Sequence, residues 1–175
     1  MKVAEMKAKE WQLRQAEEAD IPACLAVLDY GRASQRAAGF EQWPDGYPSE
    51  EDVKNDIAAG MACVMTDTQG NIAAYIAIAY YDSEYERLRE IWTPAEHYAV
   101  FHRIAVGEAY RHSGQGARLL ALAEAHVCKE GAEAVRIDTG LPNLPMQRLL
   151  ASRSYRNLGH TLYSWGPRYS YEKLL

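Results

Sequence analysis

Residues 111–116, RHSGQG, stand between an apolar strand pattern and a helical pattern, and their residue types are suited to binding an anion. Backbone N–H groups at the start of a helix lack partners within the helix, and the helix dipole places partial positive charge there. Gly114 and Gly116 would let a phosphate approach these donors, and Arg111 would add a formal positive charge. The pattern indicates a phosphate-binding loop, although a glycine-rich turn without a ligand would have the same residues.

Two nucleotide-binding motifs agree poorly with this loop. A P-loop requires Lys and then Ser or Thr after its second glycine, whereas Ala117 and Arg118 follow Gly116 here. A dinucleotide-binding fingerprint has three glycines and lies in the first strand–helix–strand unit of its chain. This loop has two glycines and follows four predicted strands, so neither motif accounts for it.

The elements that position this loop follow from hydrophobic periodicity and from turn residues. Strands are predicted at residues 11–16, 61–67, 72–81, 98–106, 132–140, 155–164 and 168–175. Helices are predicted at residues 17–39, 49–59, 114–130 and 141–154, and the acidic segment 82–96 is predicted to be a loop with at most a helical turn. This order predicts an N-terminal extension over residues 1–10, followed by a single domain over residues 11–175. The domain is expected to be an α/β fold with about seven strands in a mixed sheet and about four helices.

The composition is that of a globular domain, and it limits the partners of the protein. The 175 residues are 48% hydrophobic and carry a formal net charge of −5, which argues against general nucleic-acid binding and leaves cationic small molecules open. Cys24, Cys63 and Cys128 lack Cys-x-x-Cys spacing and fall within helix or strand patterns, so we expect buried free thiols. The histidines show no metal-ligand spacing, so no metal site is expected. Without a secretory signal or an apolar run of the ~20 residues that span a bilayer, the expected location is cytoplasmic, with no membrane partner.

The loop and three further segments together resemble the GNAT acetyltransferases. RHSGQG matches the Arg/Gln-x-x-Gly-x-Gly/Ala acetyl-CoA pyrophosphate loop of that family, and HRIAV is similar to the central strand that precedes it. RIDTGLPNLPMQRLLASRSY is similar to the later strand, turn and helix, and PRYSYEKLL is similar to the closing strand. The resemblance covers residues 11–175 in a consistent order. It implies the GNAT fold, whose central sheet is mixed and mostly antiparallel.

The resemblance also implies that an amine, most simply that of a small molecule, attacks the thioester of acetyl-CoA directly. The cofactor-binding residues that it implies are Ile104, Ala105, Val106, Arg111, His112, Ser113, Gly114, Gln115, Gly116, Ala117 and Asn143. Two alternatives remain open: acetylation of a protein N-terminus or lysine, and a module that binds acyl-CoA without turnover. A homodimer would agree with the family, in which dimers are common.

His102 is the candidate general base, because the titration range of histidine suits removal of a proton from an ammonium group. It also resembles the second His of the His-x-His-x-x-Ala-Val strand in arylalkylamine acetyltransferases. A core histidine bonded to a carbonyl is the alternative. Period-two alternation places Val100, His102, Ile104 and Val106 on one face of the strand and Phe101, Arg103 and Ala105 on the other. Arg103 is therefore expected to be a structural ion-pair partner on the opposite face.

Other positions concern the general acid and the acceptor. Leu150 stands where members with a catalytic Tyr carry it, so no general acid is identified. Trp43 and Tyr47 are candidate walls of an acceptor pocket, since aromatic faces attract cations; the alternative is a loop packed on the core. The acidic segment, which holds Asp82, Glu84, Glu86, Glu90 and Glu96, would attract amines or would be simply a solvated face.

Overall fold

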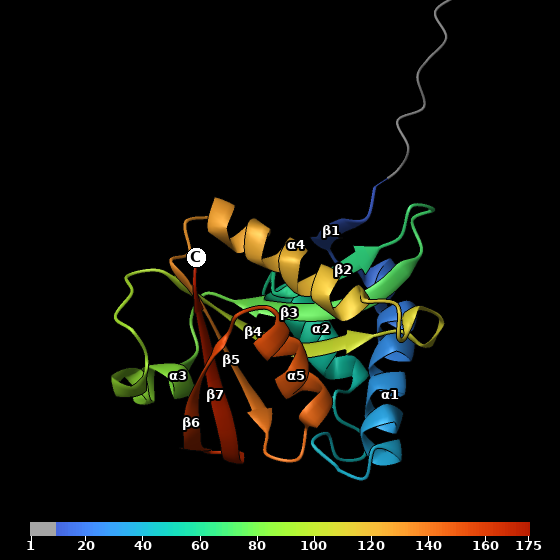
Figure 1. Ribbon diagram of the computed structural model, residues 1–175. Coiled ribbons are helices and arrows are strands. Elements are labelled where there is room, and N and C mark those ends of the chain that lie inside the picture. Colours follow the sequence, from blue (N-terminus) through green and yellow to red (C-terminus); the bar gives the residue numbers. More distant parts are fainter. Residues whose placement is uncertain (1–9) are drawn as a thin grey trace, which may run out of the picture.

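The computed structural model describes residues 10–175, which fold around one seven-stranded sheet (Figure 1). The strands are β1 Gln12–Gln15, β2 Ala62–Thr66, β3 Ile72–Ala79, β4 Tyr98–Val106, β5 Ala134–Gly140, β6 Arg156–Tyr163 and β7 Gly166–Leu174. The helices are α1 Ile21–Ala37, α2 Glu50–Ala58, α3 Ser83–Arg87, α4 Gln115–Lys129 and α5 Leu144–Ser152, with short 3-10 helices at Glu18–Asp20, Arg89–Ile91 and Glu108–Tyr110. The predicted α/β class with seven strands is confirmed. Residues 1–9 of the predicted N-terminal extension lie outside the described residues.

Five α-helices occur among the described residues rather than about four, because α3 forms inside the segment that was predicted to be a loop. Asp82 explains this helix, since its side chain accepts hydrogen bonds from the backbone N–H groups of Glu84 and Tyr85. An aspartate in this position satisfies N–H groups that a helix start leaves free.

The order of the strands is β1-β2-β3-β4-β5-β7-β6, and β4 with β5 is the one parallel neighbour pair of the described sheet. Pairing between these two covers residues 98–100 of β4 and 134–136 of β5. Beyond these residues the strands diverge (Figure 1). The fourth and fifth strands therefore splay apart. This splay leaves the edge of β4 from residue 101 to 106 without a strand partner on that side among the described residues.

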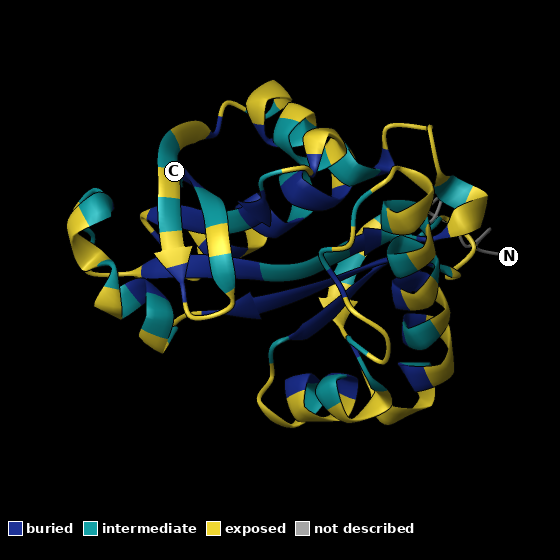
Figure 2. Cartoon of the chain, turned by 90° about the horizontal axis from the view of Figure 1, so that it is seen from below, coloured by how far each residue is buried: buried dark blue, intermediate teal, exposed yellow. Residues whose placement is uncertain are grey.

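The helices cover both faces of the sheet. Figure 1 shows α4 and α5 in front of the sheet and α2 behind it. The α4 face buries Leu119, Leu120 and Val127 against strand residues that include Ile76 and Phe101. The other face buries side chains of α1 and α2, and farther along the strands those of the α3 region, in two smaller clusters. Figure 2 shows the result, with buried residues concentrated in the strands and exposed residues on the outer sides of the helices.

A β-bulge at Arg103 interrupts β4. Ala77 of β3 lies opposite His102, yet Tyr75, two residues away, lies opposite Ala105, so β4 contains an extra residue. Arg103 has a φ of 51°, in the left-handed region. The predicted strict alternation is therefore wrong from this point on. His102 and Arg103 both lie on the face of α1 to α3, whereas Ile104 and Val106 pack on the face of α4.

Arg103 is an ion-pair partner, as predicted. Its Nε donates to Oδ2 of Asp56 in α2 at 2.8 Å, and its Nη2 donates to the other oxygen of the same carboxylate. The hydroxyl of Tyr75 also donates to Oδ2, at 2.6 Å. Burial lowers the pKa of Arg103, but the hydrogen bonds and charge of Asp56 outweigh it, and the net pKa lies above its ordinary value. The pair fixes the bulge to α2.

Cys24 and Cys63 are buried free thiols, as expected, and burial raises the pKa of Cys24 to about 12 and that of Cys63 to about 11. The expectation for Cys128 is wrong, because its side chain is exposed. Val127 belongs to the buried stripe of α4, and the next residue is rotated by about 100° around the helix, toward solvent.

Replacing Arg103 with Met is expected to lower the free energy of unfolding by about 3 kcal/mol, because the carboxylate of Asp56 would remain buried without its cation. Urea unfolding followed by circular dichroism measures the change. Arg36 is the matched control, since its ion pairs with Glu41 and Asp45 are exposed to water, and Arg36→Met should change stability much less. Equally small effects for both arginines would contradict the structural role of Arg103.

Candidate active site

The predicted phosphate-binding loop forms the N-terminus of α4. In the described part of the chain, the backbone N–H groups of residues 112–117 donate to no protein acceptor, whereas the N–H groups of Arg111 and Arg118 are bonded. Six consecutive free donors at a helix start, with the positive end of the helix dipole behind them, form a site that favours an anion. The geometry is that which the sequence pattern predicted.

The two glycines of this loop lie in different surroundings. Gly114 has a φ of 75°, and a Cβ there would point into open space, so its lack of a side chain leaves room beside the free N–H groups. A Cβ on Gly116 would lie 3.1 Å from Cδ2 of Leu149 in α5. Gly116 therefore lies close against α5, and the packing of α4 on α5 is a second reason for a glycine at this position.

Contacts to three other elements hold the loop in place. The hydroxyl of Tyr110, just before the loop, donates to Asp67 in the β2–β3 turn at 2.7 Å. Arg118 lies over the ring of Trp11, which itself packs edge-on against Tyr110. Arg111 donates to the hydroxyl of Tyr30 in α1 at 2.9 Å. Its guanidinium is therefore tied to α1 at the side of the loop.

A cavity of about 580 Å³ opens where β4 and β5 diverge. The predicted residues Trp43, Tyr47, His102, Ile104 and Asn143 all line it. The other lining residues are Gln35, Gln42, Pro44, Met61, Asp82, Phe101, Arg103, Ile137, Asp138, Thr139, Met146, Trp165 and Arg168. Residues from widely separated segments thus meet at one site, whereas Ala105 and Val106 lie along β4 between this cavity and the loop.

Two glutamines fix the segment between α1 and α2 over the cavity. Oε1 of Gln35 accepts from the backbone N–H groups of Gln42 and Trp43, which ties the segment to α1. Oε1 of Gln42 accepts from the N–H of Gly140 at 3.0 Å and from Nδ2 of Asn143 at 2.9 Å, which ties it to the end of β5. The sequence reasoning missed both glutamines; the partners of Gln42 lie about 100 residues away in the chain, and Gln35 acts only by holding the segment that carries Gln42.

Trp43 and Tyr47 occupy different depths of this wall. Trp43 is buried, and a Cβ on Gly31 of α1 would lie 3.0 Å from its ring, so the glycine makes room for the indole. The hydroxyl of Tyr47 accepts from Nη1 of Arg103 at 3.1 Å. Trp43 therefore packs on the core, as the alternative predicted, and it also lines the cavity.

Asn143 is the N-cap of α5. Its Oδ1 accepts from the N–H of Met146 at 3.2 Å while its Nδ2 bonds to Gln42. Leu150, which stands at the position of the catalytic tyrosine of other members, lies in the same helix and is fully buried in the core. Within the described residues, Tyr47 is the one tyrosine that lines the cavity.

His102 and Asp82 form a pair in the cavity wall. Nε2 of His102 lies 2.9 Å from Oδ2 of Asp82, and the imidazole packs edge-on against Tyr85. Burial raises the pKa of Asp82, but the hydrogen bond and charge of His102 and the N–H groups of the α3 start outweigh it, so its pKa lies below the ordinary value. Asp82 is therefore a carboxylate at neutral pH. The partner of His102 is this carboxylate and not the backbone carbonyl of the alternative.

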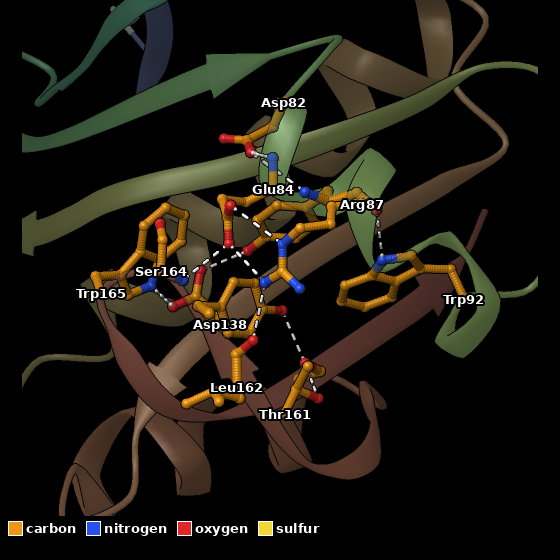
Figure 3. A network of polar contacts seen from close by, with 12 residues as sticks. Asp82, Glu84, Arg87, Trp92, Asp138, Thr161, Leu162, Ser164 and Trp165 are labelled. Atoms are coloured by element: carbon orange, nitrogen blue, oxygen red, sulfur yellow. Dashed lines mark hydrogen bonds and ion pairs between the residues drawn. The ribbon is translucent and has the colours of Figure 1, made fainter.

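The remaining acidic residues of segment 82–96 are mostly engaged in structure. Glu84 bonds to Arg87 and to the N–H of Ser164, and Arg87 reaches the carbonyl of Leu162 (Figure 3). Glu86 accepts from the hydroxyl of Tyr98. The contacts of Glu84 and Arg87 hold α3 against the β6–β7 turn. Glu90 and Glu96 are exposed and accept no side-chain hydrogen bond among the described residues, as the solvated-face alternative predicted.

Asp138 and Arg168 are cavity residues that the sequence reasoning missed. Asp138 lies near the end of β5, and Figure 3 shows the indole N–H of Trp165 bonded to it. The available signal was an acidic residue in the strand pattern AVRIDTG, which also carries Arg136. Among residues 10–175, no helix is long and apolar enough to cross a membrane, and no group of three His, Cys, Asp or Glu side chains is placed to hold a metal.

The fold thus places a helix start with free N–H groups beside a cavity in the splay of the sheet. The sequence model of the acetyltransferase (GNAT) family matches residues 28–155, and the chain belongs to this family. Like other members it is an acetyltransferase, as the resemblance implied.

Solved structures agree with this assignment. A GNAT acetyltransferase from Streptococcus agalactiae is 29% identical with a TM-score of 0.81, over 94% of this chain and 95% of its own. One from Listeria monocytogenes is 18% identical with a TM-score of 0.75, over 94% and 95%. A ribosomal-protein-alanine N-acetyltransferase from Brucella melitensis is 19% identical with a TM-score of 0.64, over 93% and 99%. The last two share the fold alone, and no curated protein matches.

Asp82→Asn is expected to lower the free energy of unfolding at neutral pH by about 1.5 kcal/mol, since Asn preserves the helix cap but removes the charge that bonds to His102. Because the folded-state pKa of Asp82 lies below its ordinary value of 3.8, this stabilisation is present above that pH and is lost as the pH falls through the folded-state value. Urea unfolding of both proteins from pH 6 to pH 3 measures the difference. A difference that grows toward low pH would contradict the assignment.

Proposed function

We propose that this acetyltransferase transfers the acetyl group of acetyl-CoA to a primary amine of a small molecule. The observation that carries the proposal is the unpaired edge of β4. It leads from the cavity at residues 101–104 to the free N–H groups of residues 112–117. A donor with a diphosphate at one end and a reactive acyl group at the other would span these two places.

The chain's own groups account for both ends of such a donor. The N–H groups of residues 112–117 would bind the diphosphate, and the free edge at Ile104, Ala105 and Val106 would bond to the amide groups of the pantetheine arm. Asn143 lines the cavity near the end of β5, although both ends of its side-chain amide are already engaged. Acetyl-CoA supplies the activated acetyl group, and the protein supplies position and a proton acceptor.

His102 is the proposed proton acceptor. Because Asp82 is a carboxylate and can only accept, the proton of a neutral His102 lies on Nε2, which leaves Nδ1 as the basic nitrogen. Nδ1 has no protein hydrogen bond among the described residues, so it is available to an amine in the cavity, directly or through water. Asp82 holds the ring in this orientation.

The size of the cavity supports a small acceptor. Its volume of about 580 Å³ lies in the usual range for sites that enclose small ligands. The segment around Trp43 and the β6–β7 turn with Trp165 both form parts of its wall. A protein N-terminus or a lysine on a protein surface would instead need an extended open groove.

Release of free thiol from acetyl-CoA with a panel of amines tests this function. Sustained release with small amines supports it, and release with peptide substrates alone would favour the protein acceptor. Cofactor binding without turnover across the panel would favour the alternative of a non-catalytic acyl-CoA-binding module.

Gly114→Glu is expected to weaken acetyl-CoA binding by at least about tenfold, because the new carboxylate would stand beside the free N–H groups and repel the diphosphate. Calorimetry measures the affinity. Gly131→Glu is the matched control, since Gly131 also has a positive φ and open space around it but lies beyond the far end of α4. Equal affinities of the two folded variants would rule out the loop as the diphosphate site.

His102→Ala is expected to lower kcat by about 10²- to 10⁴-fold while cofactor affinity stays the same, the usual scale of general base assistance. The loss should shrink as the pH rises, since an amine that is already deprotonated needs no base. Steady-state kinetics from pH 6 to pH 10 measure this, with the exposed His126→Ala as control. A pH profile parallel to that of the wild type with a several-fold offset would show that His102 only packs.

A further inference from the structure

Arg168 has donors that the protein does not use. It lies in β7 opposite Gly140 of β5, lines the cavity, and has 18% of its side chain exposed. Its Nε lies 3.4 Å from Oδ2 of Asp138 but is buried without a hydrogen bond. Among residues 10–175 no protein atom accepts a hydrogen bond from its Nη1 or Nη2, and a Cβ on Gly140 would lie 3.5 Å from Nη1. The two terminal nitrogens therefore remain available at the cavity wall.

Asp138 balances the charge of Arg168 without satisfying its donors. Oδ1 of Asp138 accepts from the hydroxyl of Tyr85 at 2.6 Å, and Oδ2 accepts from the indole N–H of Trp165 at 3.1 Å (Figure 3). Both carboxylate oxygens are thus already engaged by strong donors. A mostly buried guanidinium with unused N–H groups matches the planar pair of oxygens of a carboxylate ligand.

The other arginine of the cavity wall shows the contrast. Arg103 donates through Nε and Nη2 to Asp56 and through Nη1 to the hydroxyl of Tyr47, so each of its nitrogens has a protein partner. The donors of Arg103 are thus all used within the protein, whereas those of Arg168 are not.

The cavity wall holds two further charged pairs, Asp82 with His102 and Asp138 with Arg168. Tyr85 stands between them, since its hydroxyl bonds to Asp138 and its ring packs against His102. A simple cationic amine would have to compete with Arg168 for Asp138. A molecule with both an ammonium and a carboxylate group would find a partner for its amine in the first pair and a partner for its carboxylate in Arg168.

We propose that Arg168 binds a carboxylate group of the acceptor, and that the acceptor is an amino acid whose amine is directed at His102. Trp43, Trp165, Phe101 and Met146 line the same cavity, so an aromatic or large apolar side chain would be preferred. This assignment rests on the proposed function and names the class of its substrate.

The test compares matched ligands that differ in one group. Phenylalanine, phenylalaninamide and phenethylamine, with the corresponding sets for tryptophan, leucine and methionine, are titrated into CoA-saturated protein by calorimetry and assayed for thiol release from acetyl-CoA. The wild type is expected to bind at least one amino acid about 10- to 100-fold more tightly than its amide, since the hydrogen bonds involve two charged groups. Arg168→Gln should abolish this preference, and Arg168→Lys, which retains the charge, should restore part of it.

Arg89→Gln is the matched control, because it removes the same charge from an exposed position outside the cavity and should leave the preference intact. Equal binding of acids and amides by the wild type, no binding of any acid, or an unchanged preference in folded Arg168→Gln would each overturn the assignment. If Arg168→Gln does not fold, the wild-type comparison and Arg168→Lys decide it.

The two proposals fail separately. Turnover of amines without a preference for the amino acid over its amide would contradict the role of Arg168 and leave the acetyltransfer proposal intact. Preferential binding of the acids without any thiol release would support Arg168 as the carboxylate anchor and remove the acetyltransfer proposal.

Discussion

The site depends on one distortion of the sheet, the bulge of β4 at Arg103. A left-handed φ at a residue with a side chain costs about 1–2 kcal/mol, and here the buried ion pair with Asp56 and the hydroxyl of Tyr75 offset that cost. The bulge has two consequences. It turns both His102 and Arg103 toward the α1–α3 face, and it accompanies the departure of β4 from β5. The parallel ladder ends at Val100, three residues before the bulge, and the cavity lies beside the residues that follow.

Once β4 and β5 have separated, the walls of the cavity must come from elsewhere, and polar contacts over long sequence distances bring them there. Gln42 joins the α1–α2 segment to Gly140 and Asn143, and Gln35 joins it to α1. On the other side, Glu84 and Arg87 of α3 hold the β6–β7 turn that carries Trp165. Apart from the bond between the side chains of Gln42 and Asn143, these bonds satisfy backbone groups that irregular segments would otherwise leave unpaired. The same bonds that make the loops stable therefore also set the shape of the site.

The difference between local and long-range information explains what the sequence could predict. The glycine loop, the start of α4 and the seven strands follow from periodicity and from turn residues, which are local, and the structure confirms them. The bulge could not be predicted, since HRIAV alternates as a regular strand would and the cause is Asp56, 47 residues away. For the same reason the partner of His102 was missed, because Asp82 was recognised only as part of an acidic segment. Gly116 shows a further limit: a motif position can be filled by glycine for a packing reason, here Leu149.

The absence of a tyrosine at position 150 is compatible with acetyl transfer, for a chemical reason. Tyr85 lies beside His102 but is fully buried, and burial together with Asp138 raises its pKa well above the ordinary value. It therefore retains its proton and serves to position Asp138, and it is a poor donor to a leaving group. The leaving group in acetyl transfer from a thioester is a thiolate, and an alkyl thiol has a pKa of about 8.5. Such a group departs near neutral pH with little help from an acid, whereas an ammonium acceptor must first lose a proton. The proposed base, His102, would therefore assist the step that needs help, the loss of a proton from the acceptor.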